Sequence, residues 1–178
     1  FTAENVATVP ICREEILLIV PDEVIHKAYP DRFEEIKKKL YQSADVRLLE
    51  NCPFVLLKKG NRVRTIADEL FEDTQITPHI VLETENIETV LALSVQGMGI
   101  TFYPRMFMSS KQNLKAYHDS LMKQAGLNLF SLNYPRAHGT LAIGYHKGHY
   151  MSRATHEFIR TALEHIPSAA GLPLNTDV

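Results

Sequence analysis

The sequence predicts an α/β domain with a largely parallel sheet and helices on both faces of that sheet. Short apolar runs alternate with amphipathic segments of about three helical turns, which is the pattern of strand–helix–strand units. The chain has 178 residues, of which 45% are hydrophobic. It can therefore bury one substantial core, either undivided or shared between two lobes.

Two short apolar runs near the start of the chain predict core strands. Glu15–Pro21 reads EILLIVP and ends in proline, and Phe54–Leu57 directly follows another proline. Runs this short suit strands buried on both faces better than helices. Between the runs, Asp31–Tyr41 places apolar residues on one helical face and charges elsewhere, which predicts a surface helix with solvated lysines.

Helices and strands continue to alternate after the second run. We expect a helix with apolar positions Val63, Ile66, Ala67, Leu70 and Phe71, a strand in HIVLE after Pro78, a helix from Asn86 to Gly97, and a strand in GITFYP that ends at Pro104. We then expect strands at Leu127–Leu132 and Thr140–His146 and an amphipathic helix at Met151–Ile166. The segment 167–178 is small, polar and proline-containing, which predicts disorder.

The charge pattern argues against tight DNA binding by this segment alone. The formal net charge is −2, and lysines and arginines are scattered among acidic residues instead of forming a basic stripe. No apolar run is long enough to cross a bilayer, and the start of the sequence lacks the basic and apolar regions of a secretion signal. We therefore expect a cytoplasmic protein with no membrane partner, whose Cys12 and Cys52 stay reduced.

The strongest candidate site is the turn Lys59–Val63, in which Gly60, Asn61, Arg62 and Val63 are the predicted ligand residues. It joins the carboxyl end of a predicted strand to the start of a predicted helix, which is where open α/β sheets bind ligands. Unpaired backbone N–H groups there attract anions, and a guanidinium can hold a carboxylate through paired hydrogen bonds. Two alternatives stay open: the turn can be an ordinary polar helix cap, and Arg64 can pair with Asp68 instead of a ligand.

Three further residues should border the same edge of the sheet. Thr84 and Asn86 lie in the segment Thr84–Ile87 at the start of the next helix, and Phe102 stands beside Tyr103 at the end of the strand after it. The alternative for the first two is a helix cap, and the alternative for Phe102 is an aromatic residue of the core.

Sequence motifs of catalysis are missing. GxSxG and GxxxxGK[ST] are both absent, and no paired carboxylates have a usable spacing. The pair His146 and His149 in HKGH has no neighbouring cysteine or carboxylate that would complete a metal shell. We therefore predict no enzyme activity, no cofactor and no metal site.

The order of these segments resembles the effector-binding domain of LysR-type transcriptional regulators, whose fold is like that of type 2 periplasmic binding proteins. The resemblance rests on EEILLIVP, PFVLLKKGNRVRTIADELF, ITPHIVLETENIETVLALSVQGMGITFYP, LAIGYHKGHY and SRATHEFIRTALEHI. It implies a crossover strand from an incomplete first lobe at 1–10, a second lobe at 11–146, a terminal helix returning to the first lobe at 147–166, and the disordered tail at 167–178.

The resemblance also implies a function. A small, carboxylate-bearing effector would bind in a cleft between the lobes, against the Gly60 to Val63 turn and near Tyr145 at the second crossover. DNA would be bound through a winged helix-turn-helix domain that is not in this chain, and the protein would form a homodimer or homotetramer. The alternative is a solute-binding protein of a transporter with the same fold.

Two consequences of the resemblance concern chemistry and assembly. The positions where relatives that sense peroxide would carry a cysteine pair, around Asn61 and Phe71, hold no cysteine, so thiol sensing by Cys12 and Cys52 is disfavoured. An incomplete first lobe would leave apolar surface uncovered, which predicts association with another chain or low stability in isolation.

Overall fold

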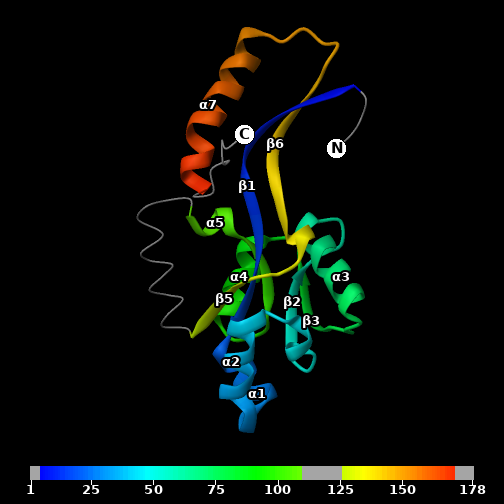
Figure 1. Cartoon of the computed structure of the whole chain (residues 1–178), viewed down its shortest axis with the longest axis vertical. Helices are drawn as coiled ribbons and strands as arrows, with labels where there is room; N and C mark the ends of the chain where they lie inside the picture. The colour runs from blue at the N-terminus through cyan, green and yellow to red at the C-terminus, as the bar shows by residue number, and fades with distance from the viewer. Residues whose placement is uncertain (1–4, 110–125, 171–178) are drawn as a thin grey trace.

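One long strand organises the molecule. The computed structural model describes residues 5–109 and 126–170, and β1 (Val6–Pro21) runs through most of its height (Figure 1). The second part of β1 pairs antiparallel with β4 (Thr101–Pro104) on one side and β5 (Leu127–Ser131) on the other. The first part pairs antiparallel with β6 (His138–His146) and, together with it, forms what we call the ribbon.

Two more strands extend the sheet beyond β4. The strands β2 (Pro53–Leu57) and β3 (His79–Thr84) pair in parallel, and a parallel bridge between Phe54 and Ile100 joins β2 to the start of β4. A glycine is required here, because a Cβ atom at Gly99 would lie 2.9 Å from the carbonyl oxygen of Pro53. The resulting main sheet has the order β3, β2, β4, β1, β5.

The directions of these strands confirm one part of the sequence prediction and correct another. The strands β2, β3, β4 and β5 run the same way, as expected for a largely parallel sheet, but β1 runs against them. The expectation of parallel pairing is therefore wrong for β1. An apolar run such as EILLIVP reports that a strand is buried on both faces and says nothing about its direction.

Helices cover both faces of the main sheet, as the alternation predicts. Ile16, Leu18 and Val20 of β1 lie in one cluster with the apolar side of α3 (Arg62–Thr74). Ile19 faces the other way and packs with Leu91 of α4 (Ile87–Val95). This two-sided burial explains why β1 and β2 read as continuous apolar runs.

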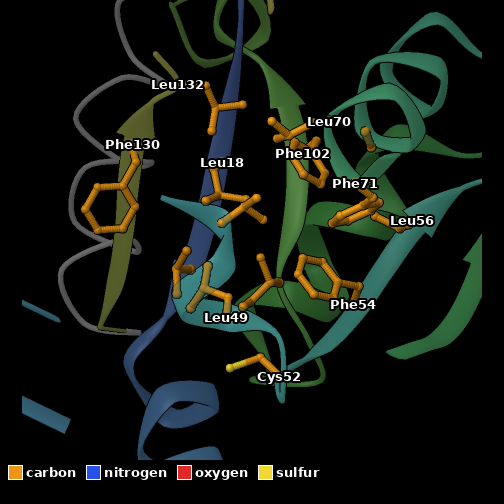
Figure 2. Packing of buried hydrophobic residues seen from close by; sticks show 14 of the residues in the cluster. Leu18, Leu49, Cys52, Phe54, Leu56, Leu70, Phe71, Phe102, Phe130 and Leu132 are labelled. Atoms are coloured by element: carbon orange, nitrogen blue, oxygen red, sulfur yellow. The ribbon is translucent and has the colours of Figure 1, made fainter. Parts of the chain in front are cut away.

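Aromatic side chains fill the centre of the larger cluster, as Figure 2 shows. The ring of Phe71 from α3 meets Phe54 of β2 at a centroid distance of 5.1 Å and Phe102 of β4 at 5.7 Å, both edge to face. Cys52 is fully buried beneath them. These contacts fix α3, and with it the turn before α3, on the main sheet.

Two helices lie below the sheet in Figure 1. They are α1 (Asp22–Ala28) and α2 (Phe33–Ser43), followed by a short 3-10 turn at Val46–Leu49. The sequence predicted α2 but not α1, because seven residues give too little periodicity to identify a helix. Ile36 and Leu40 of α2 pack into the larger hydrophobic cluster described above.

The last helix packs beside the ribbon. Ala162 of α7 (Arg153–Ala170) contacts Ile11 and Cys12 of β1, and the short helix α5 (Arg105–Ser109) lies at the base of α7. The backbone of α7 continues through Pro167 to Ala170, four residues past the predicted end, since the small residues after the proline are compatible with a helix. The rest of the predicted tail, 171–178, lies outside the described residues.

Candidate functional site

The turn between β2 and α3 opens onto a pocket. Gly60 has a φ of +96°, which lets the chain reverse between the strand and the helix. The pocket has a volume of about 320 Å³ and is lined by Leu57, Lys58, Lys59, Gly60, Asn61 and Glu85. The predicted residues Gly60 and Asn61 therefore line a real depression at the carboxyl end of β2.

Asparagine caps begin both helices at this edge. The Asn61 side-chain oxygen accepts a hydrogen bond from the Val63 N–H at 2.8 Å. Asn86 accepts from the N–H groups of Glu88 and Thr89, at 2.8 and 3.1 Å. Asn61 and Asn86 are therefore both helix caps, as the alternative interpretation of each held. Asn61 in addition lines the pocket.

Thr84 supports the second cap, since its hydroxyl accepts a hydrogen bond from the Asn86 N–H at 3.3 Å. The side chain of Val63, in contrast, is turned into the core with 8% of its surface exposed. Val63 can reach a ligand only through its backbone, whose N–H is already bound to Asn61.

The two arginines of α3 have different environments. Arg64 is 4% exposed and is held by Asp68 at 2.7 Å, by the Leu57 carbonyl at 2.9 Å and by Glu83. Arg62 is exposed and forms no ion pair with any residue that the structure describes. Arg64 therefore follows the structural alternative, whereas the guanidinium of Arg62 has no carboxylate partner among the described residues.

Arg62 does not line the pocket; it reaches toward the ribbon. A Cβ atom built on Gly139, near the start of β6, would lie 3.1 Å from the Nη2 atom of Arg62. The guanidinium thus spans the gap between α3 and β6, on the ribbon side of the turn.

Two predicted residues lie away from this turn. Phe102 is 1% exposed and packs against Phe71. It is therefore an aromatic residue of the core, which was the alternative to a place at the site. Tyr145 is half-buried on β6 opposite Ala7, about 20 Å along the strand from Gly139 at 3.3 Å per residue. The structure does not bring Tyr145 together with Arg62.

Two further side chains line this pocket: Lys58, which the sequence prediction missed, and Glu85, which lies in the segment Thr84–Ile87 that was expected to border the cleft. Their side chains form an ion pair at 3.1 Å, and each comes one residue after the paired ends of β2 and β3, Leu57 and Thr84. The sequence held a signal for this ion pair, because residues at equivalent positions after parallel strands meet at one edge of a sheet. Using that signal required knowing that β2 and β3 are neighbours.

A polar cluster marks the point where β1 leaves the ribbon and enters the main sheet. Glu15, which is 9% exposed, accepts hydrogen bonds from Arg105 at 2.5 Å and from Ser131. Burial by itself raises the pKa of Glu15, but the hydrogen bonds from Ser131 and Arg105 outweigh it and lower the pKa below its usual value. His138 lies directly opposite Glu15 on β6.

At Glu14, burial outweighs hydrogen bonding in its effect on the pKa. One carboxylate oxygen accepts from the Glu15 N–H at 2.7 Å, while Oε2 is buried without a hydrogen-bond partner among the described residues. Burial raises the pKa of Glu14, and the backbone amides of Glu15 and Met106 offset only part of that rise.

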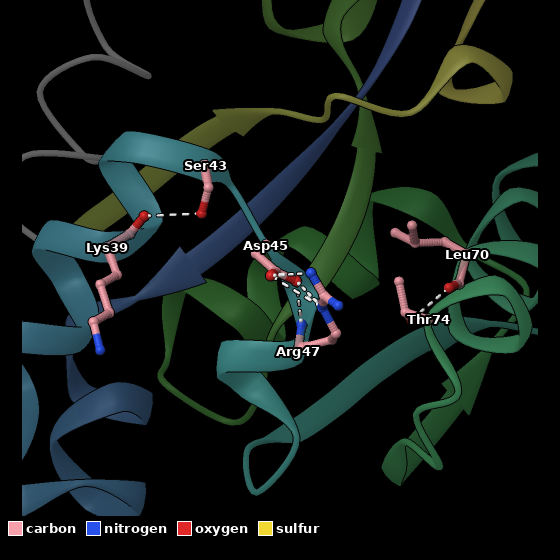
Figure 3. Close-up of polar contacts among 6 residues, drawn as sticks. All are labelled: Lys39, Ser43, Asp45, Arg47, Leu70 and Thr74. Atoms are coloured by element: carbon pink, nitrogen blue, oxygen red, sulfur yellow. Dashed lines mark hydrogen bonds and ion pairs between the residues drawn. The ribbon is translucent and has the colours of Figure 1, made fainter.

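A second pocket of about 340 Å³ lies between the end of α2, the end of α3 and the loop after β5. Charged and polar side chains in this pocket already have partners, as Figure 3 shows in part. Arg47 is bound by Asp45 at 2.8 Å, and the Thr74 hydroxyl donates to the Leu70 carbonyl at 2.6 Å. Asp73 accepts from the Tyr134 hydroxyl at 2.8 Å. This pocket offers less unpaired charge than the turn at Gly60.

Both cysteines are buried and unbonded, and burial raises the pKa of Cys52 to about 12, which suppresses its thiolate. The rings of His146 and His149 are 4.5 Å apart. Over residues 5–109 and 126–170, no group of three or more potential metal ligands comes together. Within the same ranges, no helix is long and apolar enough to cross a membrane.

The fold is that of the effector-binding domains of transcriptional regulators. The effector binding domain of QuiR, solved in complex with shikimate, superposes with a TM-score of 0.61 over 97% of this chain and 69% of that chain, at 19% identity. Full-length CbnR in complex with its target DNA gives a TM-score of 0.57 over 93% of this chain and 50% of that chain, at 15% identity.

The family follows from the sequence itself. The LysR substrate binding domain model matches residues 2–167, so the chain belongs to that family. It is 28% identical over 114 residues to the uncharacterized HTH-type transcriptional regulator YcgK of Bacillus subtilis, an alignment that covers 61% of this chain and 35% of YcgK. The chain thus spans about a third of the length of this relative.

Proposed function

We propose that this domain senses a small, carboxylate-bearing metabolite for a LysR-type transcriptional regulator. The effector lies in a cleft between two lobes, the second of which is residues 11–146, and it contacts the turn from Gly60 to Val63. The observation that carries the proposal is the contrast between the two arginines: Arg64 is bound by two carboxylates, whereas Arg62, beside the turn, forms no ion pair among the described residues.

The surroundings of the turn favour an anionic ligand. Lys59 lines the pocket without an ion pair among the residues described, and the first N–H groups of α3 contribute the positive end of the helix dipole. Glu85 is neutralised by Lys58. The carboxylate ligand of QuiR, shikimate, is a chemical precedent within the fold.

Signal transfer follows from the architecture of the family. The ligand acts through different affinities for two arrangements of the lobes and subunits, with a coupling of about 1–3 kcal/mol. DNA is contacted through a separate helix-turn-helix domain, as the complex of CbnR with its target DNA supports. The regulator works in the cytoplasm as a homodimer or homotetramer and carries out no catalysis.

A thermal-shift screen against organic acids, amino acids and aromatic acids, starting with shikimate, tests this proposal. A saturable rise of the melting temperature identifies a ligand. Arg62→Ala should then weaken binding about tenfold or more, because a charge-assisted hydrogen bond is worth about 1.5–3 kcal/mol. Arg153→Ala, which removes another exposed arginine at the start of α7, is the control and should bind like the unmodified protein.

Calorimetry gives the affinities of the variants. Equal affinity of the Arg62→Ala variant and the unmodified protein for every ligand found would contradict the assignment of Arg62. Melting temperatures that no acid raises would contradict the proposed ligand class.

A further inference from the structure

A glycine of β6 faces the one arginine that the proposed function uses. We propose that Gly139 positions Arg62 and thereby sets the size of the ligand group that Arg62 can hold; the second half of this inference rests on the proposed function. The carrying observation is that an added Cβ atom at residue 139 would lie 3.1 Å from the Arg62 Nη2 atom.

The glycine is not needed for the backbone. Gly139 lies inside β6 and is not among the described residues with a positive φ, so any residue could adopt its conformation. A glycine in a strand lowers stability and gives no side chain to pack, and it often marks a close approach of another group. Here the one atom within 4 Å of an added Cβ atom, among the described residues and apart from chain neighbours, is Nη2 of Arg62.

The location gives this contact its importance. Gly139 pairs with Glu14 of β1, one position from the pair between Glu15 and His138, where β1 passes from the ribbon to the main sheet. Arg62 is the first residue of α3, directly after the pocket turn. The guanidinium therefore lies between the helix at the pocket and the strand that leads to α7.

A side chain at residue 139 would change the position of Arg62 more than the stability of the fold. The tip of an arginine is flexible, so it can move away from a new methyl group at small cost. The displaced guanidinium would have to leave β6 and occupy other space around the turn. The expected effect is thus a changed position of the cation and a changed preference among carboxylates, with the domain still folded.

The direct test is the side-chain NMR signal of Arg62, its Nε–Hε resonance, assigned by its loss in Arg62→Lys. The signal should shift in Gly139→Ala and shift further in Gly139→Val. Gly144→Ala is the matched control, because it adds a methyl group to the same strand where the nearest atom, Cγ1 of Val6, is 3.4 Å away. An Arg62 signal that stays unchanged in a folded Gly139→Val variant overturns the positioning role.

Binding then tests the specificity role. With shikimate, benzoate and citrate as probes, Gly139→Val should change the ratio of affinities for the larger and smaller acids by about tenfold, the size of one lost or misplaced contact, and Gly144→Ala should leave the ratio unchanged. An unchanged ratio in Gly139→Val overturns the specificity role. A shifted Arg62 signal in a protein that binds no carboxylate would support the positioning role and contradict the proposed function.

Discussion

At the scale of single residues, the environment decides what a charged side chain can do. Arg62 and Arg64 are two positions apart on one helix, yet Arg64 is buried with two carboxylates and Arg62 is exposed. Glu14 and Glu15 are adjacent on one strand, yet only Glu15 accepts hydrogen bonds from the side chains of Ser131 and Arg105. Burial therefore raises the pKa of Glu14, whereas these hydrogen bonds lower the pKa of Glu15.

The arginine pair predicts a difference in stability. Arg64→Ala should lower the free energy of unfolding by about 1–3 kcal/mol, because it removes a buried hydrogen bond to Leu57 and partly buried ones to Asp68 and Glu83. Arg62→Ala should change it by about 0.5 kcal/mol or less, as expected for an exposed residue without an ion pair in the described part of the chain. Urea unfolding of both variants checks this, and equal losses would contradict the two roles.

The glutamate pair predicts a dependence on pH. The native state binds the Glu14 proton more tightly than the unfolded state does, so this residue lowers stability as the pH rises from the ordinary glutamate pKa through its raised native value. Glu14→Gln should therefore raise the free energy of unfolding at neutral pH and have little effect in acid.

Glu15→Gln is the matched variant with the opposite sign. The lowered pKa of Glu15 gives stability that is present above its unfolded pKa and is lost as the pH falls through its native pKa. Its replacement should lower stability at neutral pH and lose this effect in acid. Melting curves across the acid to neutral range measure both, and parallel pH profiles of the two variants would rule out this account.

At the scale of elements, helix starts determine the geometry of the site. The helices α3 and α4 both begin at an asparagine cap, and both caps stand where a parallel strand has just ended. The same residue types therefore serve folding first, by satisfying N–H groups that the helix leaves unpaired. Their place beside a pocket is a consequence of the strand order.

The cap of α4 predicts how stability changes when the hydrogen-bond acceptor at Asn86 is removed and when it is kept with an added negative charge. Asn86→Ala should cost about 1 kcal/mol, the usual value for a lost N-cap. Asn86→Asp keeps an acceptor for the Glu88 and Thr89 N–H groups and places a negative charge at the helix start, so it should retain full stability. Chemical denaturation compares them; a loss in Asn86→Asp as large as in Asn86→Ala would show that capping is not what matters.

At the scale of the whole molecule, the two halves differ in completeness. The main sheet has helices on both faces, whereas the ribbon is two-stranded and carries α7 on one side (Figure 1). Neither outer edge of the ribbon pairs with another strand among the described residues. Leu141 of β6 and Phe158 and Leu163 of α7 are 37%, 63% and 40% exposed.

This surface predicts self-association. Open strand edges beside exposed apolar residues favour pairing with another chain. Sedimentation should show dimers or larger species, and the double variant Phe158→Gln/Leu163→Gln should shift the population toward monomer. Met98→Gln removes a comparably exposed apolar residue, at 44%, from the turn after α4 and should have no effect. A stable monomer at high protein concentration would contradict the expectation.

The sequence by itself determined most of the elements, and it proposed a location for the site. Apolar runs identified β2, β4 and the buried part of β1, and polar residues after Leu57 and Thr84 identified the two helix starts. These features are local: burial on two faces requires a continuous apolar run, and an unpaired helix start requires an acceptor side chain. The family resemblance rested on the same local features in their order.

Only the tertiary structure decided which side chains remain available and which segments meet. The reversed direction of β1, the burial of Phe102, the saturation of Arg64 by Glu83, and the approach of Arg62 to Gly139 all depend on residues distant in sequence. A sequence pattern reports how a residue relates to its own element. Two packed elements together decide which partner a charged side chain has. They also decide whether a glycine leaves space for that side chain.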